Sequence, residues 1–462
     1  MIGGGVAATG GAAAVDHGVT VTIFDAGARL GGKCTGVTVP MADGRGCDVD
    51  LGVSDFNAET FVRVRGLLDA LGVAYAPICQ DAAFVDPGGC AALWTREGHA
   101  HAESAAAAGL GDEIARFGRA AVAMLDDPAC ADWDLQRFLH AHGFAPAFAA
   151  AYVHPRAIGC FAMPGGDPGR FPASSLLRFW RGHGLVGRSD PPPRMAVVGG
   201  MHRYCDALQR WLAARGAEIR CGTAVTEIVA HRDGIAVACD DVGPARRFDH
   251  VVVAAPPHAL ARVRLRGAGL DVLAAFVRLP SQRARVVAHT DAGFMPRARE
   301  RWGAYNYVVG ARAAAPTLTF YPKRLRGLPD DAPDVFVTMN PHRPIDPCRV
   351  IAERMFDHPL ACSAARGLAA QIDRLQGRGN LWACGSHLRE PFLHEQALAS
   401  GEDVADRLVQ GGRRQPRRTR PSPSRTSPVP AASSATKPCE SAGEACRELG
   451  PIAPGPTTFC SP

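Results

Sequence analysis

Residues 1–34 read MIGGGVAATGGAAAVDHGVTVTIFDAGARLGGKC, and this stretch decides the fold. Gly3 and Gly5 stand in a tight turn between a short apolar strand and an alanine-rich helix, with Ala8 where a third glycine often stands. Asp25 ends the next strand, twenty positions after Gly5. Gly3 permits the turn and Gly5 lets the backbone approach a pyrophosphate at the helix N-terminus, while Asp25 accepts a hydrogen bond from a ribose hydroxyl. The stretch therefore predicts a dinucleotide-binding βαβ unit.

The first strand of this unit is short. Only Met1 and Ile2 precede the glycine turn, whereas strands usually have about five residues. We expect the natural start of the protein to lie upstream of Met1, which the mass of the native N-terminus tests. The alternative interpretation of the whole stretch is a glycine-rich turn that binds no ligand.

Length and composition indicate a folded protein of more than one domain. The chain has 462 residues, of which 47% are hydrophobic and 21% charged. Its net charge of +6 is uneven, because residues 411–462 carry seven Arg and one Lys against three Glu, which leaves +1 for the rest. A nearly neutral body does not favour a nucleic-acid groove.

The segment 411–462 differs from the rest of the chain. It is rich in Pro, Ser, Arg and Gly and has few large apolar residues, so we expect a disordered basic tail. Binding of its RRQPRRTR run to nucleic acid or to a membrane surface is the less favoured alternative.

Fifteen cysteines are scattered along the chain without a Cys-x-x-Cys pair. The glycine turn leaves no room for a signal peptide, and no apolar run is long enough to cross a membrane. We therefore expect reduced thiols in a cytoplasmic protein. The histidine pairs His99/His101 and His140/His142 lack neighbouring ligands at metal-site spacing, so no metal is expected.

The pattern beyond the first unit alternates between two types. Short strands and helices around AAFVD, AALWT, IARFGRAAVAMLDD and LQRFLHAHG mark one mixed unit, and strands at TLTFYP and DVFVTMN mark its continuation. A helix ending at Gly216, a hairpin-like pair GIAVACDD and RFDHVVVAAPP, a buried strand NLWACGS and a helix ending at Gly411 return to the first type. We expect an α/β fold: a Rossmann-like domain in three pieces, 1–75, 195–265 and 375–410, and a mixed α+β substrate domain, 76–194 and 266–374.

Four separated segments together resemble the flavin-containing amine oxidase superfamily. They are FDAGARLGGKC at 24–34, VDLGVSDF at 49–56, GGMHRYCDAL at 199–208 with FDHVVVAAPP at 248–257, and CGS at 384–386 with HEQALASGEDVA at 394–405. The resemblance covers about residues 1–409 and is nearest to bacterial FAD/NAD-binding, amine-oxidase-like proteins. It implies that the interrupted Rossmann-like domain binds FAD.

Carried over residue by residue, the resemblance implies a set of FAD-binding positions. The pyrophosphate would be held by Gly3, Gly5 and Ala8, and the ribose by Asp25. The path toward the flavin would be lined by Arg29, Gly31, Gly32, Lys33 and Gly52, with Asp50 nearby. The adenine would meet Val225, and the flavin end would be surrounded by Gly385, Ser386, Glu395, Ala397 and Leu398. The helix that begins near Glu395 would stabilise negative charge on the reduced ring. The chain departs from relatives at His387, where an acid is common, and at Gln396, where a glycine is common.

The resemblance implies an FAD-dependent oxidoreductase that dehydrogenates a C–N or C–C bond of a small or lipid-like substrate by hydride transfer. The lysine that several amine oxidases place near the flavin is missing from residues 256–302, and we interpret Lys323 as a surface residue. Cys384 is interpreted as a buried thiol and not as a covalent flavin attachment. No catalytic residue is assigned.

Aromatic residues in the second insertion have two interpretations. Trp302, Tyr305, Tyr307 and Tyr321 would either wall the substrate face or form ordinary sheet core. Two other functions also remain open, an NAD-only binding protein and a degenerate binding protein without turnover. A colourless pure protein would favour the first, and stoichiometric FAD without turnover the second.

Overall fold

The computed structural model describes residues 1–414 except 42, 87, 97–98, 103–104, 162–166, 189, 242 and 310–316. Met1–Gln415 form one compact unit. The predicted tail lies outside the described residues from 415 onward, whereas 411–414 belong to a helix.

A parallel sheet carries the glycine turn at its centre. Its strands are β10 (Glu218–Cys221), β1 (Thr22–Asp25), β14 (Val251–Val253) and β21 (Leu381–Ala383). Between β1 and β14 stands Ile2, which bridges in parallel to Phe24 on one side and Val253 on the other. Its N–H donates to the carbonyl of Val252 at 2.8 Å, and its own carbonyl accepts from Ala254 at 2.8 Å. The predicted Rossmann-like α/β fold is confirmed, with one residue in place of a full first strand.

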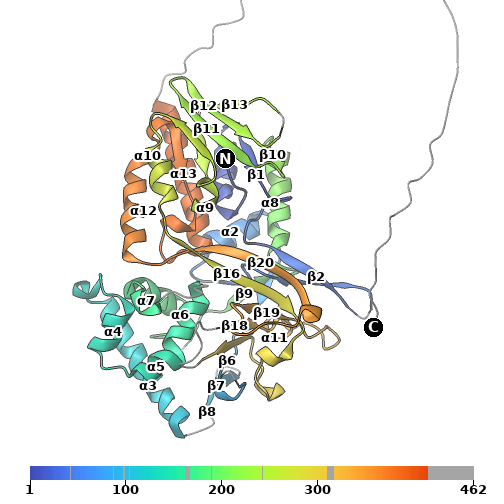
Figure 1. The fold of residues 1–462 in the computed structure, drawn as a ribbon, viewed down its shortest axis with the longest axis vertical. Helices are drawn as coiled ribbons and strands as arrows, with labels where there is room; N and C mark the ends of the chain where they lie inside the picture. The colour runs from blue at the N-terminus through green and yellow to red at the C-terminus, as the bar shows by residue number, and fades with distance from the viewer. Residues whose placement is uncertain are drawn as a thin grey trace, which may run out of the picture. The chain divides into compact units, whose positions relative to one another are not determined.

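Helices pack around this sheet. They are η1 (Val6–Thr9), α1 (Gly10–Asp16), α2 (Val62–Ala70), α8 (His202–Ala214), α9 (Pro257–Leu260), α10 (Asp271–Val277), α12 (Ser363–Leu375), η9 (Ser386–Leu388) and α13 (His394–Arg414). In Figure 1, α10, α12 and α13 lie together near the strands of the N-terminal segment. Helix α8 ends before Gly216 as predicted, but α13 continues beyond the predicted end at Gly411 to Arg414.

The closing helix α13 approaches the first helix backbone to backbone. A Cβ added at Gly10 would stand 2.2 Å from the carbonyl oxygen of Gly401, and one added at Gly401 would stand 2.1 Å from that of Ala7. Only glycine fits at both positions, because the atoms in the way belong to the backbone and cannot rotate aside. The first and last helices around the parallel sheet are therefore held in direct backbone contact.

A four-stranded sheet lies beside the parallel sheet, in the order β13 (Arg246–Phe248), β12 (Gly234–Cys239), β11 (Val225–His231), β15 (Arg264–Gly267). The predicted hairpin-like pair is only half right. Strand β12 pairs with the short β13, whereas β14 leaves this sheet and pairs with β21. Asp249 and His250 separate the two, and the all-apolar β14 is fully buried in the parallel sheet.

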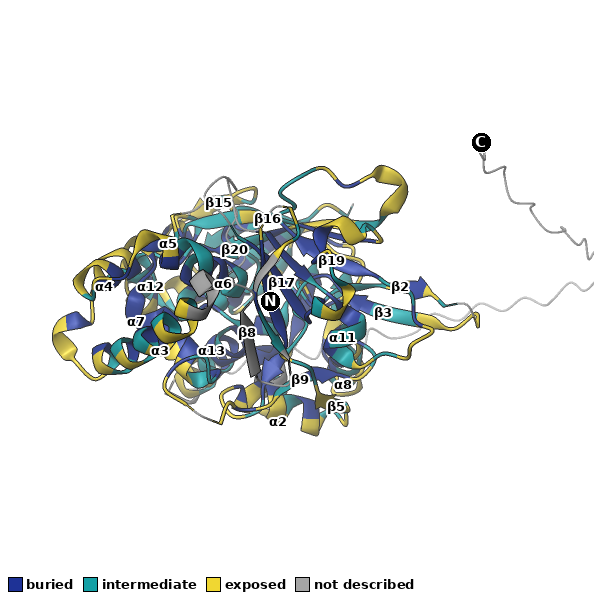
Figure 2. Cartoon of the chain, turned by 90° about the horizontal axis from the view of Figure 1, so that it is seen from below, coloured by how far each residue is buried: buried dark blue, intermediate teal, exposed yellow. Residues whose placement is uncertain are grey.

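The second large sheet of the unit has eight strands. Its order is β20 (Val350–Pro359), β16 (Ser281–His289), β19 (Phe336–Met339), β18 (Thr317–Phe320), β17 (Tyr305–Val308), β6 (Ala82–Val85), β7 (Ala91–Arg96), β8 (His99–Ala102). The strands predicted at AAFVD, AALWT, TLTFYP and DVFVTMN are confirmed as β6, β7, β18 and β19. Figure 2 shows buried residues gathered on central strands such as β17, while the outer sides of helices such as α3 and α4 are exposed.

The remaining elements of the unit are helices and short helical turns. The helices are α3 (Ala105–Leu125), α4 (Leu135–Ala141), α5 (Pro146–Phe148), the π-helix η3 (Ala149–Val153), α6 (His154–Phe161), α7 (Ala173–Gly182) and α11 (Pro322–Arg326). The short helical turns are η2 (Pro128–Cys130), η4 (Pro168–Arg170), η5 (Ala292–Phe294), η6 (Arg299–Arg301), η7 (Pro347–Arg349) and η8 (Arg378–Asn380). Helix α6 contacts β17 and β18.

Two small sheets link the elements. They are the hairpin of β2 (Gly36–Pro40) with β3 (Gly46–Asp50) and the sheet β4 (Phe56–Asn57), β9 (Arg194–Val197), β5 (Tyr75–Pro77). Within the described ranges no helix combines the length and apolar character that a membrane crossing requires. The same residues contain no cluster of three or more metal-ligating side chains.

Candidate functional site

The glycine turn has one closed side and one open side. Gly3 has φ +97° and donates its N–H to the carbonyl of Phe24 at 2.8 Å, and a Cβ there would stand 2.5 Å from the backbone nitrogen of Ala255. A Cβ at Gly5 would meet no atom within 4 Å. Ala8 is buried in η1. Gly5 thus faces open space at the start of a helix, as a pyrophosphate cradle requires.

Asp25 is held by backbone N–H groups at the end of β1. Its carboxylate accepts from Gly4 at 2.5 Å and from Gly27 at 2.6 Å. Its carbonyl accepts from Thr223 at 2.9 Å, which brings the start of β11 at Val225 beside this loop. The predicted ribose and adenine positions therefore meet at one end of the parallel sheet.

The segment 31–33 lies against the glycine turn. Gly31 donates to the carbonyl of Gly4 at 2.8 Å, and a Cβ at Gly32 would stand 3.1 Å from the Cα of Gly5. Gly52 packs so closely on the carbonyl of Lys33 that a Cβ would stand 1.9 Å from its oxygen. The side chain of Arg29, by contrast, belongs to an exposed residue.

The last segment brings a second open glycine to the same region. Gly385, at φ +140°, donates to the hydroxyl of Ser400 at 3.1 Å, and a Cβ there would meet nothing within 4 Å. Ser386 begins η9 directly after it. In α13, Ala397 packs in one core cluster with Ala7, and Leu398 packs in another.

Glu395 has a partner that the sequence did not indicate. Its carboxylate accepts from the backbone N–H groups of Arg63 at 2.9 Å and Val64 at 3.0 Å. These are the first turn of α2, whose N–H groups have no partner within the helix. The side chain of Glu395 thus caps α2 and fixes it to the start of α13.

Lys33 lies in a cluster contributed by four segments. Its Nζ is 3.5 Å from Nδ1 of His358 at the end of β20, and His258 of α9 pairs with Asp357 at 3.2 Å. Burial lowers the pKa of Lys33 to about 8, although Asp357 acts in the opposite direction. Burial and Lys33 lower the pKa of His387 in η9 to about 3, and the same causes hold that of His358 well below its usual value. At neutral pH the cluster therefore contains one ammonium facing neutral histidines.

A second buried network lies beneath the start of α13. The hydroxyl of Tyr204 is 2.9 Å from Nε2 of His394 and 3.0 Å from Sγ of Cys34. Burial raises the pKa of Tyr204 well above its usual value. Cys384 is also buried, with its Sγ 3.8 Å from the carbonyl of Ala7, and burial raises its pKa to about 12. These thiols are therefore protonated packing groups.

The second-insertion aromatics divide between two clusters. Tyr305 and Tyr307 belong to the large core under α6, whereas Trp302 and Tyr321 pack with Phe336 in another. The two pairs thus do not line one common wall. Lys323 donates to the carbonyls of Asp330 at 2.5 Å and Ala332 at 2.9 Å, which ties it to its own loop.

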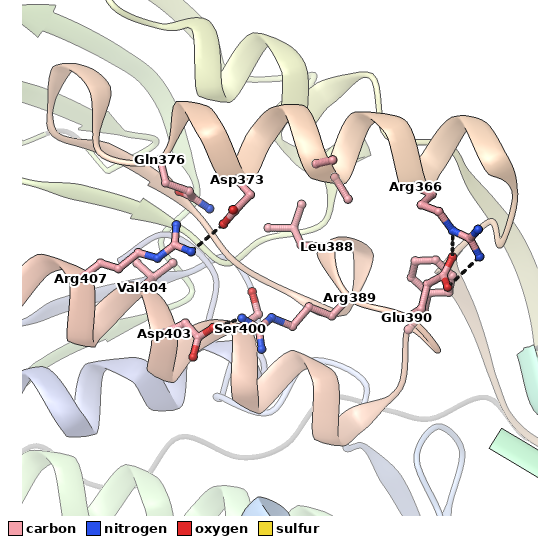
Figure 3. Close-up of a pocket in the computed structure, with 13 residues that line it drawn as sticks. Arg366, Asp373, Gln376, Leu388, Arg389, Glu390, Ser400, Asp403, Val404 and Arg407 are labelled. Carbon is pink, nitrogen blue, oxygen red and sulfur yellow. Dashed lines mark hydrogen bonds and ion pairs between the residues drawn. The ribbon is translucent and has the colours of Figure 1, made fainter. Parts of the chain in front are cut away.

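A pocket of about 470 Å³ lies between α12, α13 and the 388–392 loop. Ion pairs line it, among them Arg366 with Glu390 at 3.0 Å and Arg407 with Asp373 at 2.7 Å (Figure 3). None of the predicted cofactor residues lines this pocket. It adjoins the candidate site at Leu388 of η9 and at Ser400, the partner of Gly385.

The model of one protein family, described as flavin containing amine oxidoreductase, matches residues 15–294. This is more than half of the chain. The chain belongs to the flavin containing amine oxidoreductase family. A search of the curated proteins found no match.

Solved structures of similar fold include enzymes of several types. Cyclohexylamine oxidase from Brevibacterium oxydans IH-35A has a TM-score of 0.62 at 14% identity, with 89% of this chain and 98% of that chain covered. A putative protoporphyrinogen oxidase from Exiguobacterium sp. 255-15 has a TM-score of 0.61 at 13% identity, with 89% and 98% covered. The CLA-producing fatty acid isomerase from P. acnes has a TM-score of 0.62 at 14% identity, with 88% and 97% covered. At these identities the likeness concerns the fold.

As a flavin containing amine oxidoreductase, this chain is an FAD-dependent oxidoreductase that acts on a small-molecule substrate. Its residues fit the cofactor. Gly5 and Gly385 face open space, and two buried polar atoms of the Lys33 cluster have no partner within the described part of the chain: Nε2 of His387 and Nδ1 of His258. Buried polar groups normally have partners, so these atoms indicate a polar ligand that completes the site.

Sequence reasoning missed several residues of this oxidoreductase. His258, Asp357 and His358 approach Lys33 from distant segments, and only the Pro-Pro step before His258, directly after a buried strand, was a usable signal. The contact of Gly10 with Gly401 had no signal beyond the glycines themselves.

Proposed function

We propose that this flavoenzyme dehydrogenates a C–N or C–C bond of a small or lipid-like substrate by transferring a hydride to FAD. When bound, FAD supplies the electron sink for two electrons and one proton, and the substrate loses its second hydrogen as a proton. The observation that carries the proposal is the meeting of two open glycine turns, at Gly5 and Gly385, with the buried Lys33 cluster.

The proposal assigns the cofactor as follows. Gly3, Gly5 and Ala8 hold the pyrophosphate, and Asp25 holds the ribose beside Val225. The segment of Gly31, Gly32, Lys33 and Gly52 continues toward the ring, and Gly385, Ser386, Ala397 and Leu398 surround it. Support comes from the backbone contacts that join these segments. In this assignment Glu395 acts indirectly, because its carboxylate caps α2 and thereby positions the start of α13.

Lys33 has an electrostatic role in the proposed reaction. A hydride adds one negative charge to the cofactor ring, and a fixed cation nearby stabilises that charge in a site of low dielectric constant. The histidines around Lys33 are neutral at pH 7, so its ammonium is the buried cation of the cluster, whereas Arg283, which pairs with Asp357, is exposed. No lysine between 256 and 302 is needed for this role.

We also propose the division into an FAD-binding domain, 1–75, 195–265 and 375–410, and a substrate domain, 76–194 and 266–374, except that α10 and α12, which fall within 266–374, pack on the parallel sheet and belong to the first domain. The strands β1, β10, β14 and β21 support it, because they come from all three pieces of the first set. A cytoplasmic location is proposed too, supported by described cysteines that are all free.

The experiment is an anaerobic reduction assay on the FAD-loaded protein. A panel of amines, saturated acids and unsaturated acids is added, and the visible flavin band is followed. At least one compound should bleach the band, and readmitted oxygen or an electron acceptor should restore it. An FAD-loaded protein that dithionite bleaches but no panel compound reduces would contradict dehydrogenation by hydride transfer.

A further inference from the structure

One arginine beside the eight-stranded sheet has no charge partner among the described residues. Arg156 lies on α6, where its guanidinium carbon is 4.9 Å from the ring centroid of Tyr152 and 5.3 Å from that of Phe84. Its Nε is buried and makes no hydrogen bond, and no ion pair joins it to any described acidic side chain. Aromatic faces attract a cation but do not accept all of its N–H groups.

The neighbouring arginine is already compensated. Arg194 of β9 pairs with Asp55 at 3.4 Å and donates to the hydroxyl of Tyr305 at 3.0 Å. Tyr305 in turn donates to Asp55 at 3.2 Å. Both arginines act on one thiol, because burial raises the pKa of Cys160 while Arg194 and Arg156 lower it. The carboxylate of Asp55 thus compensates Arg194 and leaves Arg156 without a partner among the described acidic side chains.

The other titratable groups of this cluster are neutral near pH 7. Burial, followed by Arg194, lowers the pKa of His183 to about 4. Burial raises the pKa of Tyr307 to about 12, although Arg156 opposes the shift. Tyr307 stacks on Phe84 with ring centroids 4.9 Å apart. The cluster therefore holds one excess positive charge in an aromatic surrounding.

This cluster adjoins the proposed cofactor segment. Asp55 follows Gly52 by three residues, and Gly52 packs on the backbone of Lys33. Helix α6 contacts β17, the strand that carries Tyr305 and Tyr307. Asp55, the acidic residue of this cluster, thus lies three residues from the segment that packs on Lys33.

We propose that Arg156 binds the carboxylate of an anionic substrate, with an apolar body that lies against the aromatic rings around the guanidinium. The inference rests on the proposed function and names its substrate class. A carboxylate supplies the acceptor that the buried Nε of this half-buried arginine lacks, in the planar geometry that arginine matches best. A protonated amine would meet the excess positive charge and be repelled.

The test compares two probes with the same body and opposite charge, 4-phenylbutanoate and 4-phenylbutylamine. Isothermal titration of the FAD-loaded protein measures both dissociation constants, and the visible spectrum of the flavin reports binding near the ring. The acid should bind at least about tenfold more tightly than the amine. Tighter binding of the amine overturns the proposal.

Two variants and a control localise the effect. Arg156→Gln should remove the preference for the acid, and Arg156→Lys, which keeps the charge without the planar fork, should retain part of it. Arg178→Gln, on an exposed position of α7, removes the same charge and should leave the preference unchanged. An unchanged preference in Arg156→Gln would refute the assignment. If that variant lacks a native unfolding transition, the Arg156→Lys ratio decides, and a preference equal to that of the wild type refutes it.

The outcomes separate this inference from the proposed function. A protein that prefers the acid through Arg156 but whose flavin is reduced by no compound keeps the anion site and contradicts the hydride transfer. A flavin that amines reduce, in a protein that shows no preference for the acid, supports the hydride transfer and refutes the anion site at Arg156.

Discussion

The buried ammonium of Lys33 makes the stability of the FAD-free protein depend on pH. Burial lowers its pKa from 10.5 to about 8. Between these values the unfolded chain binds more protons than the folded one, so the free energy of unfolding rises with pH through this window. At 1.36 kcal/mol for each unit of pKa, the cost of burying the charge at neutral pH is on the order of 3 kcal/mol.

The perturbation is Lys33→Met, which keeps the length of the side chain and removes the charge. The FAD-free variant should be more stable than the wild type by up to about 3 kcal/mol at pH 7. This gain should shrink as the pH rises above 8 and vanish near pH 10.5. Bound FAD brings negative charge to the site, so it should reduce the gain.

The assay is urea unfolding of both proteins, with and without FAD, at several pH values between 7 and 10.5. Arg232→Met serves as the control, because Arg232 is an exposed cation in the turn between β11 and β12. Its effect should be small and independent of pH. A difference between Lys33→Met and the wild type that does not change with pH, or a less stable variant at pH 7, would refute the reasoning.

Three further substitutions test contacts of the site. Gly401→Ala should destabilise the protein by about 3 kcal/mol in urea unfolding, because the new Cβ meets the carbonyl of Ala7, whereas Gly411→Ala in the same helix meets no atom within 4 Å and should be neutral or stabilising. Glu395→Ala should cost about 2 kcal/mol by leaving two N–H groups of α2 without their acceptor, and Glu402→Ala, with one exposed ion pair, should cost less than about 1 kcal/mol; equal losses would contradict the capping role. Asp25→Ala should weaken FAD binding about tenfold in a fluorescence titration, while Asp16→Ala should not change it.

The dinucleotide unit was predictable from the sequence because its information is local. The glycine turn, the apolar strand and Asp25 lie within one short segment, and the structure joins them as expected. The Rossmann-like fold and the buried strand β21 are confirmed for the same reason. Helix α13 runs past Gly411, since a glycine is tolerated at this exposed position near the helix end.

Partners chosen across long sequence distances were not predictable. The pattern around Glu395 predicted a position at the flavin, but nothing in it shows that α2 offers unpaired N–H groups nearby. The sequence pattern predicts that VVV of β14 pairs with its neighbour in sequence. It pairs with β21 instead, because full burial on both faces suits the parallel sheet. The histidines around Lys33 become a cluster only when β20, α9 and η9 meet.

The backbone contact between Gly10 and Gly401 has a consequence for biosynthesis. One half of it is made at the start of translation and the other almost at the end of this unit. A ribosome must therefore release nearly the entire unit before the glycine turn gains this backbone support. Nascent chains that stop short of α13 would reach the quality-control machinery without it.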